Sequence, residues 1–214
     1  MSKETIVTLS LIVLLVLSGC STGPVSTLTY SGPTEQTVPM GQTLDGSDIR
    51  YVAYSDEGAE VTIGGQRAIK KTGDSLDWKG SPVAGVDVAL ALRVLSANSQ
   101  RLMTVGTVKL TVRDVAPVAA PFPDKPLYSY QVAVTYNVRR GATIPGTLIS
   151  YEGKTDEGAK LGGVSGYPYR KLGDSIGWEG RLRENAYLDM TVRVIAYTDD
   201  FIQVGGLATV GLVE

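Results

Sequence analysis

One segment of the chain occurs twice, one hundred residues apart. Residues 73–80 read GDSLDWKG, and residues 173–180 read GDSIGWEG. Over the longer stretches 41–100 and 141–200, about 17 of 60 aligned positions are identical, far more than unrelated sequences share. The chain therefore contains an internal duplication, and its fold has to be one module built twice.

Length and charge narrow the class of protein. The chain has 214 residues, 43% of them hydrophobic, and a formal net charge of −2. This length is enough for two domains of about ninety residues each. A slightly acidic balance gives no broad basic surface for nucleic acid, so we expect no nucleic-acid partner.

The duplicated parts show the alternation that is typical of β-strands. In residues 86–94 apolar side chains alternate with mostly polar or small ones, a period of two that places one face on a core. Residues 188–194 keep this pattern with different apolar residues, as expected where volume matters more than identity. The residues predicted to face the core are Val86, Val88, Leu90, Leu92, Val94, Leu188, Met190, Val192 and Val194.

The first strands of the two modules are predicted to differ. Residues 127–139 alternate cleanly and predict a regular first strand for the second module. The matching residues 27–40 are interrupted by Gly32, Pro33 and Pro39, so we expect that edge of the first module to be irregular.

A proline-rich segment separates the modules. Residues 116–126 read APVAAPFPDKP, which favours extended polyproline II and a semi-rigid spacer. After the first twenty residues, no stretch of ten or more shows a helical stripe. The predicted fold class is therefore all-β, with two tandem β-sandwich repeats that are immunoglobulin-like or related.

The first twenty residues have the features of an export signal. Lys3 precedes an apolar run at residues 5–17, which has the length of a signal h-region and is short for a bilayer span. Residues 17–20 read LSGC and resemble the lipobox of bacterial lipoproteins. The resemblance implies that Cys20 becomes the first mature residue and carries lipid. The alternative is a plain signal peptide or an uncleaved anchor with an incidental cysteine.

The lipoprotein resemblance also implies a location. Ser21 follows the cysteine, and in Gram-negative lipoproteins a residue other than Asp at this position indicates the outer membrane. We therefore expect a lipid-anchored outer-membrane protein that is periplasmic or surface-exposed; in a Gram-positive cell it would lie on the outer face of the only membrane. Since Cys20 is the only cysteine, no intramolecular disulfide can form. The predicted division of the chain is signal peptide 1–19, lipidated tether 20–26, repeat 27–113, linker 114–126 and repeat 127–214.

The duplicated motif also raises the question of catalysis. Residues 73–76 read GDSL, the signature of the GDSL hydrolases, in which the serine is the nucleophile. That family supplies a histidine as the base, and this chain has no histidine. The preferred interpretation is a tight turn in which the Asp caps backbone N–H groups, Trp78 or Trp178 enters a strand as a core anchor, and Gly80 or Gly180 ends that strand. We expect a protein that is not an enzyme and has no cofactor.

Carboxylates near the repeated turns are candidates for calcium. Calcium takes six to eight oxygen ligands, and many extracellular β domains bind it between loops. The spacing here is not that of an EF-hand, and Asp-Glu-Gly is equally typical of a hairpin turn. The candidate ligands are Asp56, Glu57, Asp74, Asp156, Glu157 and Asp174.

Tyrosines are the remaining candidates for a binding surface. Tyrosine is enriched at interaction surfaces but is also a good strand former. Tyr187 and Tyr197 are predicted to face outward in the second module, where the first module has Asp87 and Ala97. They are the candidate interaction residues.

These expectations combine into one hypothesis for function and two alternatives. The hypothesis is a non-catalytic lipoprotein, anchored to the membrane through Cys20, that presents an interaction surface to an envelope protein. An accessory subunit of a secretion, conjugation or pilus assembly fits this architecture. The alternatives are an immunity or superinfection-exclusion lipoprotein, and a glycan- or calcium-binding module.

Overall fold

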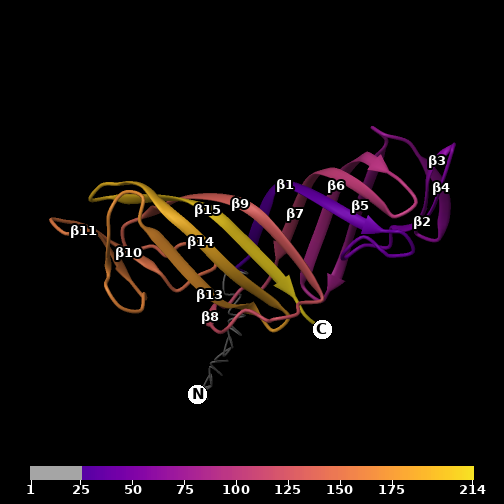
Figure 1. Cartoon of the computed structure of the whole chain (residues 1–214). Helices are drawn as coiled ribbons and strands as arrows, with labels where there is room; N and C mark the ends of the chain where they lie inside the picture. Colours follow the sequence, from indigo (N-terminus) through magenta and orange to yellow (C-terminus); the bar gives the residue numbers. More distant parts are fainter. Residues whose placement is uncertain (1–25) are drawn as a thin grey trace, which may run out of the picture.

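The computed structural model describes residues 26–214, and within this range the chain forms strands and turns without a helix. The prediction of an all-β protein is confirmed. The strands form four sheets, and all strand pairs in them are antiparallel. Figure 1 shows the two repeats side by side, with the first in indigo to magenta and the second in orange to yellow.

The first repeat consists of a four-stranded sheet, in the order β1-β7-β6-β5, and a three-stranded sheet, β2-β3-β4. Its strands are β1 (Leu28–Pro39), β2 (Arg50–Ser55), β3 (Gly58–Ile63), β4 (Gln66–Lys70), β5 (Ser75–Val83), β6 (Val86–Ala97) and β7 (Arg101–Val112).

The second repeat has the same arrangement with one added strand. Its large sheet has the order β8-β13-β14-β15-β9, and its small sheet is β10-β11-β12. The strands are β8 (Val118–Ala119), β9 (Tyr128–Arg139), β10 (Ser150–Thr155), β11 (Gly158–Gly162), β12 (Tyr169–Arg170), β13 (Ser175–Arg183), β14 (Ala186–Tyr197) and β15 (Phe201–Leu212).

The predicted core positions are buried. All nine apolar residues predicted to face inward on β6 and β14 are at most 3% exposed. Alternation thus fixes which face of each long strand packs on the core, because successive side chains of a strand point to opposite faces.

Two predictions about strand ends are wrong. Strand β1 is regular through Pro39 and pairs with β7 without a register shift. It tolerates Pro33 because it is an edge strand, where the missing N–H can face away from the neighbour. Gly80 and Gly180 do not end their strands, which continue to Val83 and Arg183. They are glycines because a Cβ there would meet the tryptophan ring two residues earlier.

The repeated Gly-Asp-Ser motif builds the same turn in both copies. The Asp74 side chain accepts a hydrogen bond from the N–H of Lys71 at 2.8 Å, and the Arg93 guanidinium donates to the carbonyl of Gly73 at 2.9 Å. In the second copy Asp174 and Arg193 make the equivalent bonds at 2.7 and 2.9 Å. The motif is therefore used architecturally, as the turn interpretation predicts.

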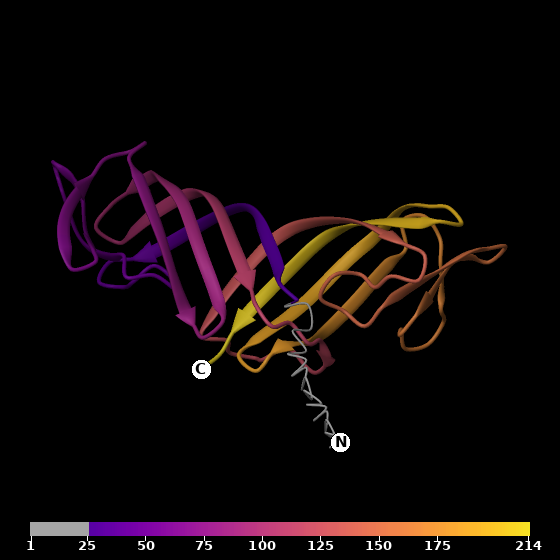
Figure 2. The same ribbon diagram turned by 180° about the vertical axis from the view of Figure 1, so that it is seen from behind.

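The two repeats meet with approximate two-fold symmetry. Strands β1 and β9 lie next to each other at the centre of the molecule in both views (Figure 1, Figure 2). A Cβ built on Gly32 would lie 3.3 Å from the Cβ of Val132, the residue one hundred positions later. Contact between equivalent residues is expected at a two-fold axis.

A tyrosine of each repeat packs against a glycine of the other repeat at this junction. Tyr130 of the second repeat inserts beside Gly46 of the first and donates a hydrogen bond to the carbonyl of Asp45 at 2.9 Å. Tyr30 of the first repeat lies beside Gly146 of the second, so the contact is isologous. Both tyrosines are 1% exposed.

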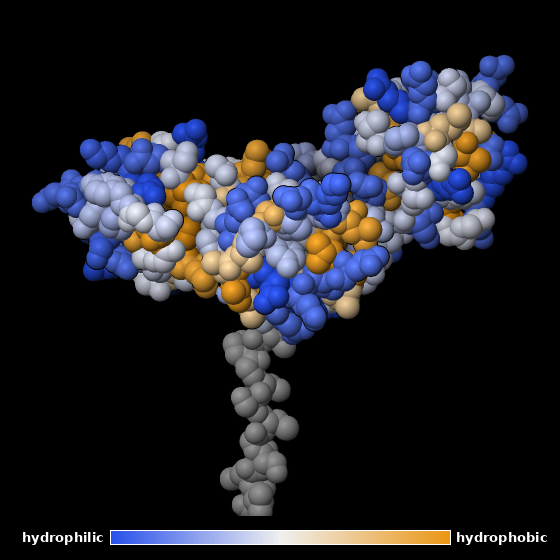
Figure 3. Space-filling model, turned by 60° about the horizontal axis from the view of Figure 1, so that its bottom comes forward, coloured by the Kyte–Doolittle hydropathy of each residue, from blue (hydrophilic) through white to orange (hydrophobic). Residues whose placement is uncertain are grey.

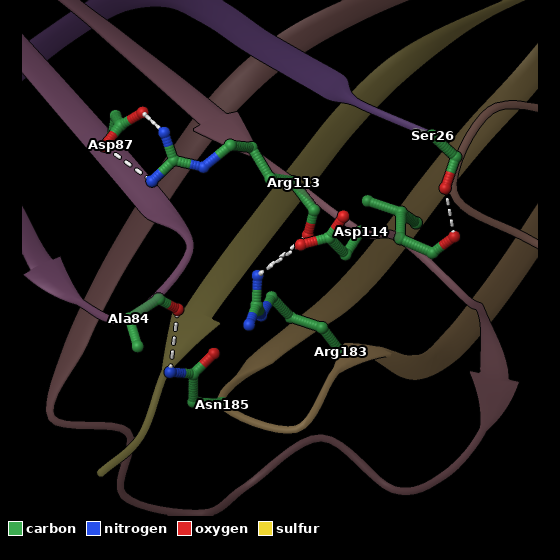
Figure 4. Close-up of polar contacts among 8 residues, drawn as sticks. Ser26, Ala84, Asp87, Arg113, Asp114, Arg183 and Asn185 are labelled. Carbon is green, nitrogen blue, oxygen red and sulfur yellow. Dashed lines mark hydrogen bonds and ion pairs between the residues drawn. The ribbon is translucent and has the colours of Figure 1, made fainter. Parts of the chain in front are cut away.

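Hairpin tips make a second contact between the repeats, shown in Figure 4. The Arg183 guanidinium donates to the carbonyl of Arg113 at 2.9 Å, and the Asn185 side chain donates to the carbonyl of Ala84 at 3.0 Å. The buried side chains of both repeats form one hydrophobic cluster. In the face shown in Figure 3, polar residues cover the far ends of the two repeats and apolar residues are visible between them.

Candidate functional site

The predicted interaction residues Tyr187 and Tyr197 do not form one patch. They lie at opposite ends of β14, about 33 Å apart at the usual rise of a strand. A register shift between Val194 and Ala196 separates them, and Tyr197 packs partly against the core. Both side chains are half-buried. Their role in binding stays a prediction.

The six candidate calcium ligands are exposed and lie in turns. The described residues contain no group of three or more acidic, histidine or cysteine side chains placed to hold a metal ion. Asp74 and Asp174 are each engaged by a backbone N–H of their own turn. Asp56 and Glu57 line a pocket that also contains Lys70 and Lys71. The structure thus does not gather these carboxylates into one site.

Cys20 lies outside the described residues, so its lipidation stays a prediction. The part of the chain that the structure describes contains no helix able to span a membrane. Ser26, the first described residue, is held at the junction of the repeats: it exchanges hydrogen bonds with Val115, donating from its hydroxyl and accepting at its carbonyl (Figure 4).

The sheet edges formed by β5 and β13 are equivalent, but only one of them is covered. The linker strand β8 pairs with β13, placing Ala119 opposite Gly180 and Val118 opposite Arg181. The carbonyl of Leu182 accepts a further hydrogen bond from Ala116 at 2.8 Å. Within residues 26–214 no strand pairs with the outer edge of β5.

Equivalent residues of β13 and β5 differ in burial. Trp178, Gly180 and Leu182 are buried, whereas the residues one hundred positions earlier, from Trp78 onward, are only half-buried. Both strands come from the duplicated segment and pair with their inner neighbours in the same register up to Gly80 and Gly180. The linker is the element that makes the difference.

The linker also covers the outer face of the second large sheet. Phe122 lies over Gly211, where a Cβ would approach the ring to 2.6 Å, and its N–H donates to the Glu179 carboxylate at 3.1 Å. Glu179 stands opposite Asp189 on β14. Burial, and secondly the charge of Glu179, raise the pKa of Asp189. The covered site therefore contains two neighbouring carboxylates, Glu179 and Asp189.

The matching place in the first repeat is an open groove of about 460 Å³. It is lined by the outer faces of β5, β6 and β7. The lining residues are Lys79, Gly80, Ser81, Asp87, Val88, Ala89, Lys109 and Thr111. Four of them, at positions 79, 80, 89 and 111, correspond to Glu179, Gly180, Asp189 and Gly211 of the covered site.

The groove has a lysine, Lys79, where the covered site has Glu179, and a second lysine, Lys109, where the second repeat has Thr209. Asp87 is neutralised by Arg113, whose guanidinium lies 2.9 Å from its carboxylate, and it also accepts a hydrogen bond from Ser81 at 2.5 Å. No ion pair within residues 26–214 involves Lys79 or Lys109. Two lysines thus dominate the groove, which is suited to binding an anionic group.

Sequence reasoning missed this site. Its residues lie on strands that were correctly predicted, but nothing in their pattern marks a binding surface. The usable signal was the linker, which occurs once in a chain whose modules occur twice. No protein-family model, curated protein or solved structure matches the chain, so the β5 edge and its groove rest on the geometry alone.

Proposed function

We propose that this protein is a non-catalytic, lipid-anchored component of the cell envelope that presents a protein-binding surface. The observation that carries the proposal is the uncovered edge of β5 beside a basic groove, at a place that the linker fills in the second repeat. An exposed sheet edge is a common site for binding an extended segment of another protein.

The anchor in this proposal is lipid on Cys20 in the outer membrane. Ser26 is six residue steps from Cys20, so the tether spans at most about 22 Å. Ser26 is held where the two repeats meet. The body would therefore stay close to the membrane surface, as suits an accessory subunit of a secretion, conjugation or pilus assembly.

The proposal includes the architecture of the repeats. We infer that each repeat is a β-sandwich of the immunoglobulin-like kind. What supports this is that each large antiparallel sheet is accompanied by a three-stranded one, with Tyr51 and Tyr151 of the small sheets fully buried in the common core.

Two measurements test the proposal. Wild-type protein is expected in the membrane fraction, and Cys20→Ser is expected to release it or to block its maturation. In cells, a photo-crosslinking amino acid at Ser81, Tyr187 or Tyr197 is then used to capture neighbours, which mass spectrometry identifies. A dominant envelope-protein adduct supports the proposal. Absence of a specific adduct from all three positions would contradict it.

A further inference from the structure

The pairing of β8 with β13 shows how an added segment can pair with the equivalent, open edge of β5. We propose that β5 and its groove bind an extended, carboxylate-bearing segment of a partner protein, which adds as an antiparallel strand as β8 does on β13. This inference rests on the proposed function and specifies the partner's chemistry. The partner segment would take the place that residues 116–122 take in the second repeat.

The backbone acceptors needed for such pairing are present on β5. On β13 the carbonyls of Leu182 and Glu179 accept from the linker at 2.8 and 3.5 Å. The equivalent carbonyls belong to Pro82 and Lys79, and proline keeps its carbonyl although it lacks an N–H. Pro82 can therefore accept one backbone hydrogen bond from a short added strand. Because it lacks an N–H, it interrupts the hydrogen bonds of a longer strand, and this protects the edge from aggregation.

The side chains in the groove select against the protein's own linker. Where Gly211 leaves space for the Phe122 ring, the first repeat has Thr111, whose Cβ occupies that space. Where Glu179 accepts the N–H of Phe122, the first repeat has Lys79, which cannot accept a hydrogen bond. A second copy of the chain that offered its linker would therefore fit poorly.

The same differences favour an acidic partner. Lys79 and Lys109 face one groove, and Asp87 is already paired with Arg113. A carboxylate placed where Phe122 lies on the other repeat would meet the two ammonium groups. Small apolar residues flanked by proline, as in β8, suit the strand part, because such residues pair with the equivalent edge at Gly180 and Arg181, where the carbonyl of Val118 lies close to Gly180.

The test compares three peptides on the mature lipidated chain in detergent micelles. The first is the linker segment Ala-Pro-Val-Ala-Ala-Pro-Phe-Pro with blocked termini, and the other two carry Glu or Gln in place of its Phe. Each bears a fluorophore, and binding is followed by anisotropy, with empty micelles as blank. The Glu peptide is expected to bind about fivefold more tightly than the Gln peptide, the effect of about one exposed ion pair.

Variants identify the groove as the site. Lys79→Glu is expected to weaken the binding of the Glu peptide by about tenfold, since the attraction between the lysine and the peptide carboxylate becomes a repulsion between two carboxylates. Lys154→Glu is the matched control, because Lys154 is exposed on β10 of the other repeat. The double variant Lys79→Glu, Thr111→Gly recreates two residues of the covered site and is expected to reverse the preference in favour of the Phe peptide. Circular dichroism checks that each variant is folded.

Several results would overturn the inference. These are no binding of the Glu peptide at millimolar concentration, equal binding of the Glu and Gln peptides, or equal effects of Lys79→Glu and Lys154→Glu. Tighter binding of the Phe peptide to the wild type would show that a second copy is the occupant. In cells, a Ser81 adduct with residues 20–25 of the same chain would assign the edge to the tether. The proposed function would survive any of these if Tyr187 or Tyr197 still captured an envelope protein.

Discussion

At the scale of single residues, the junction depends on glycine and tyrosine in pairs. Gly46 and Gly146 have φ values of 69° and 81°, which L side chains rarely adopt, and each lies against a tyrosine of the other repeat. The glycines thus satisfy two requirements, a left-handed turn and a close approach. Gly41 has a similar φ of 84° but no atom within 4 Å of a built Cβ.

Alanine substitutions separate these two requirements. Gly41→Ala is expected to lower the free energy of unfolding by about 1 kcal/mol, the cost of the left-handed conformation alone. Gly46→Ala is expected to cost about 1–3 kcal/mol more, because its Cβ would collide with the Tyr130 hydroxyl. Urea denaturation measures both. Equal losses would show that the tyrosine contact contributes nothing.

The buried tyrosines predict a loss of stability at high pH. Burial raises the pKa of both Tyr30 and Tyr130 above the ordinary value of 10.0. Nearby Tyr136 raises the pKa of Tyr30 further, and the charge of Asp45 raises that of Tyr130 further. Above pH 10 the unfolded chain releases these protons while the folded protein retains them. Stability is then complete below pH 10 and falls as pH rises, by up to about 1.4 kcal/mol per pH unit for each tyrosine.

This loss is measured by urea denaturation between pH 8 and pH 11. Tyr130→Phe is expected to make the decline above pH 10 less steep, although it lowers stability at neutral pH by about 1 kcal/mol through the lost bond to Asp45. Tyr167→Phe is the control, because Tyr167 is 63% exposed. An unchanged slope in Tyr130→Phe would contradict the assignment.

At the scale of elements, two strands of common origin have different environments. Strand β13 is an inner strand because β8 pairs with it, whereas β5 is an edge strand within the described chain. Trp178 is 9% exposed, and Trp78 is only partly buried. The linker therefore completes one sheet and leaves the other sheet able to accept a strand.

Single-tryptophan variants compare these environments directly. Trp178→Phe leaves Trp78 as the only indole, and Trp78→Phe leaves Trp178. The protein that retains Trp78 is expected to emit at longer wavelength and to be quenched more strongly by acrylamide, because water and quencher reach the uncovered edge. Equal quenching of the two variants would mean that the edge of β5 is covered in solution.

At the scale of the whole molecule, the repeats share a core and a two-fold junction. Buried residues of both belong to one hydrophobic cluster, and the tyrosine–glycine contacts are made from each repeat to the other. The second repeat also donates hydrogen bonds to carbonyls of the first at the hairpin tips. Cooperative unfolding is expected where the parts of a protein share buried contacts in this way.

The same single-tryptophan variants test this cooperativity. Trp78 reports on the first repeat and Trp178 on the second. Because each substitution can change the overall stability, the fluorescence curve of each variant is compared with the circular dichroism curve of the same variant. In both variants the two urea curves are expected to coincide. Separate transitions, with one repeat melting before the other, would contradict a shared cooperative unit.

The sequence was enough to predict the elements. The offset of one hundred residues identified two equivalent modules, alternation identified the buried faces of β6 and β14, and the Gly-Asp-Ser turn was interpreted correctly. These features are local, since a strand's period of two and a turn's backbone requirements are set by neighbouring residues. The regularity of β1 was missed, because a proline is tolerated or not according to the strand's position in the sheet.

The tertiary structure alone decided what distinguishes the repeats. Duplicated segments at residues 73–80 and 173–180 form one open and one covered edge, because the linker between the repeats pairs with β13. Contacts such as Tyr130 with Gly46 join residues far apart in sequence and leave no periodic signal. The candidate site is such a case: Lys79, Lys109 and Thr111 become a groove only when β5 and β7 are brought to the same sheet face and no segment of the described chain covers them.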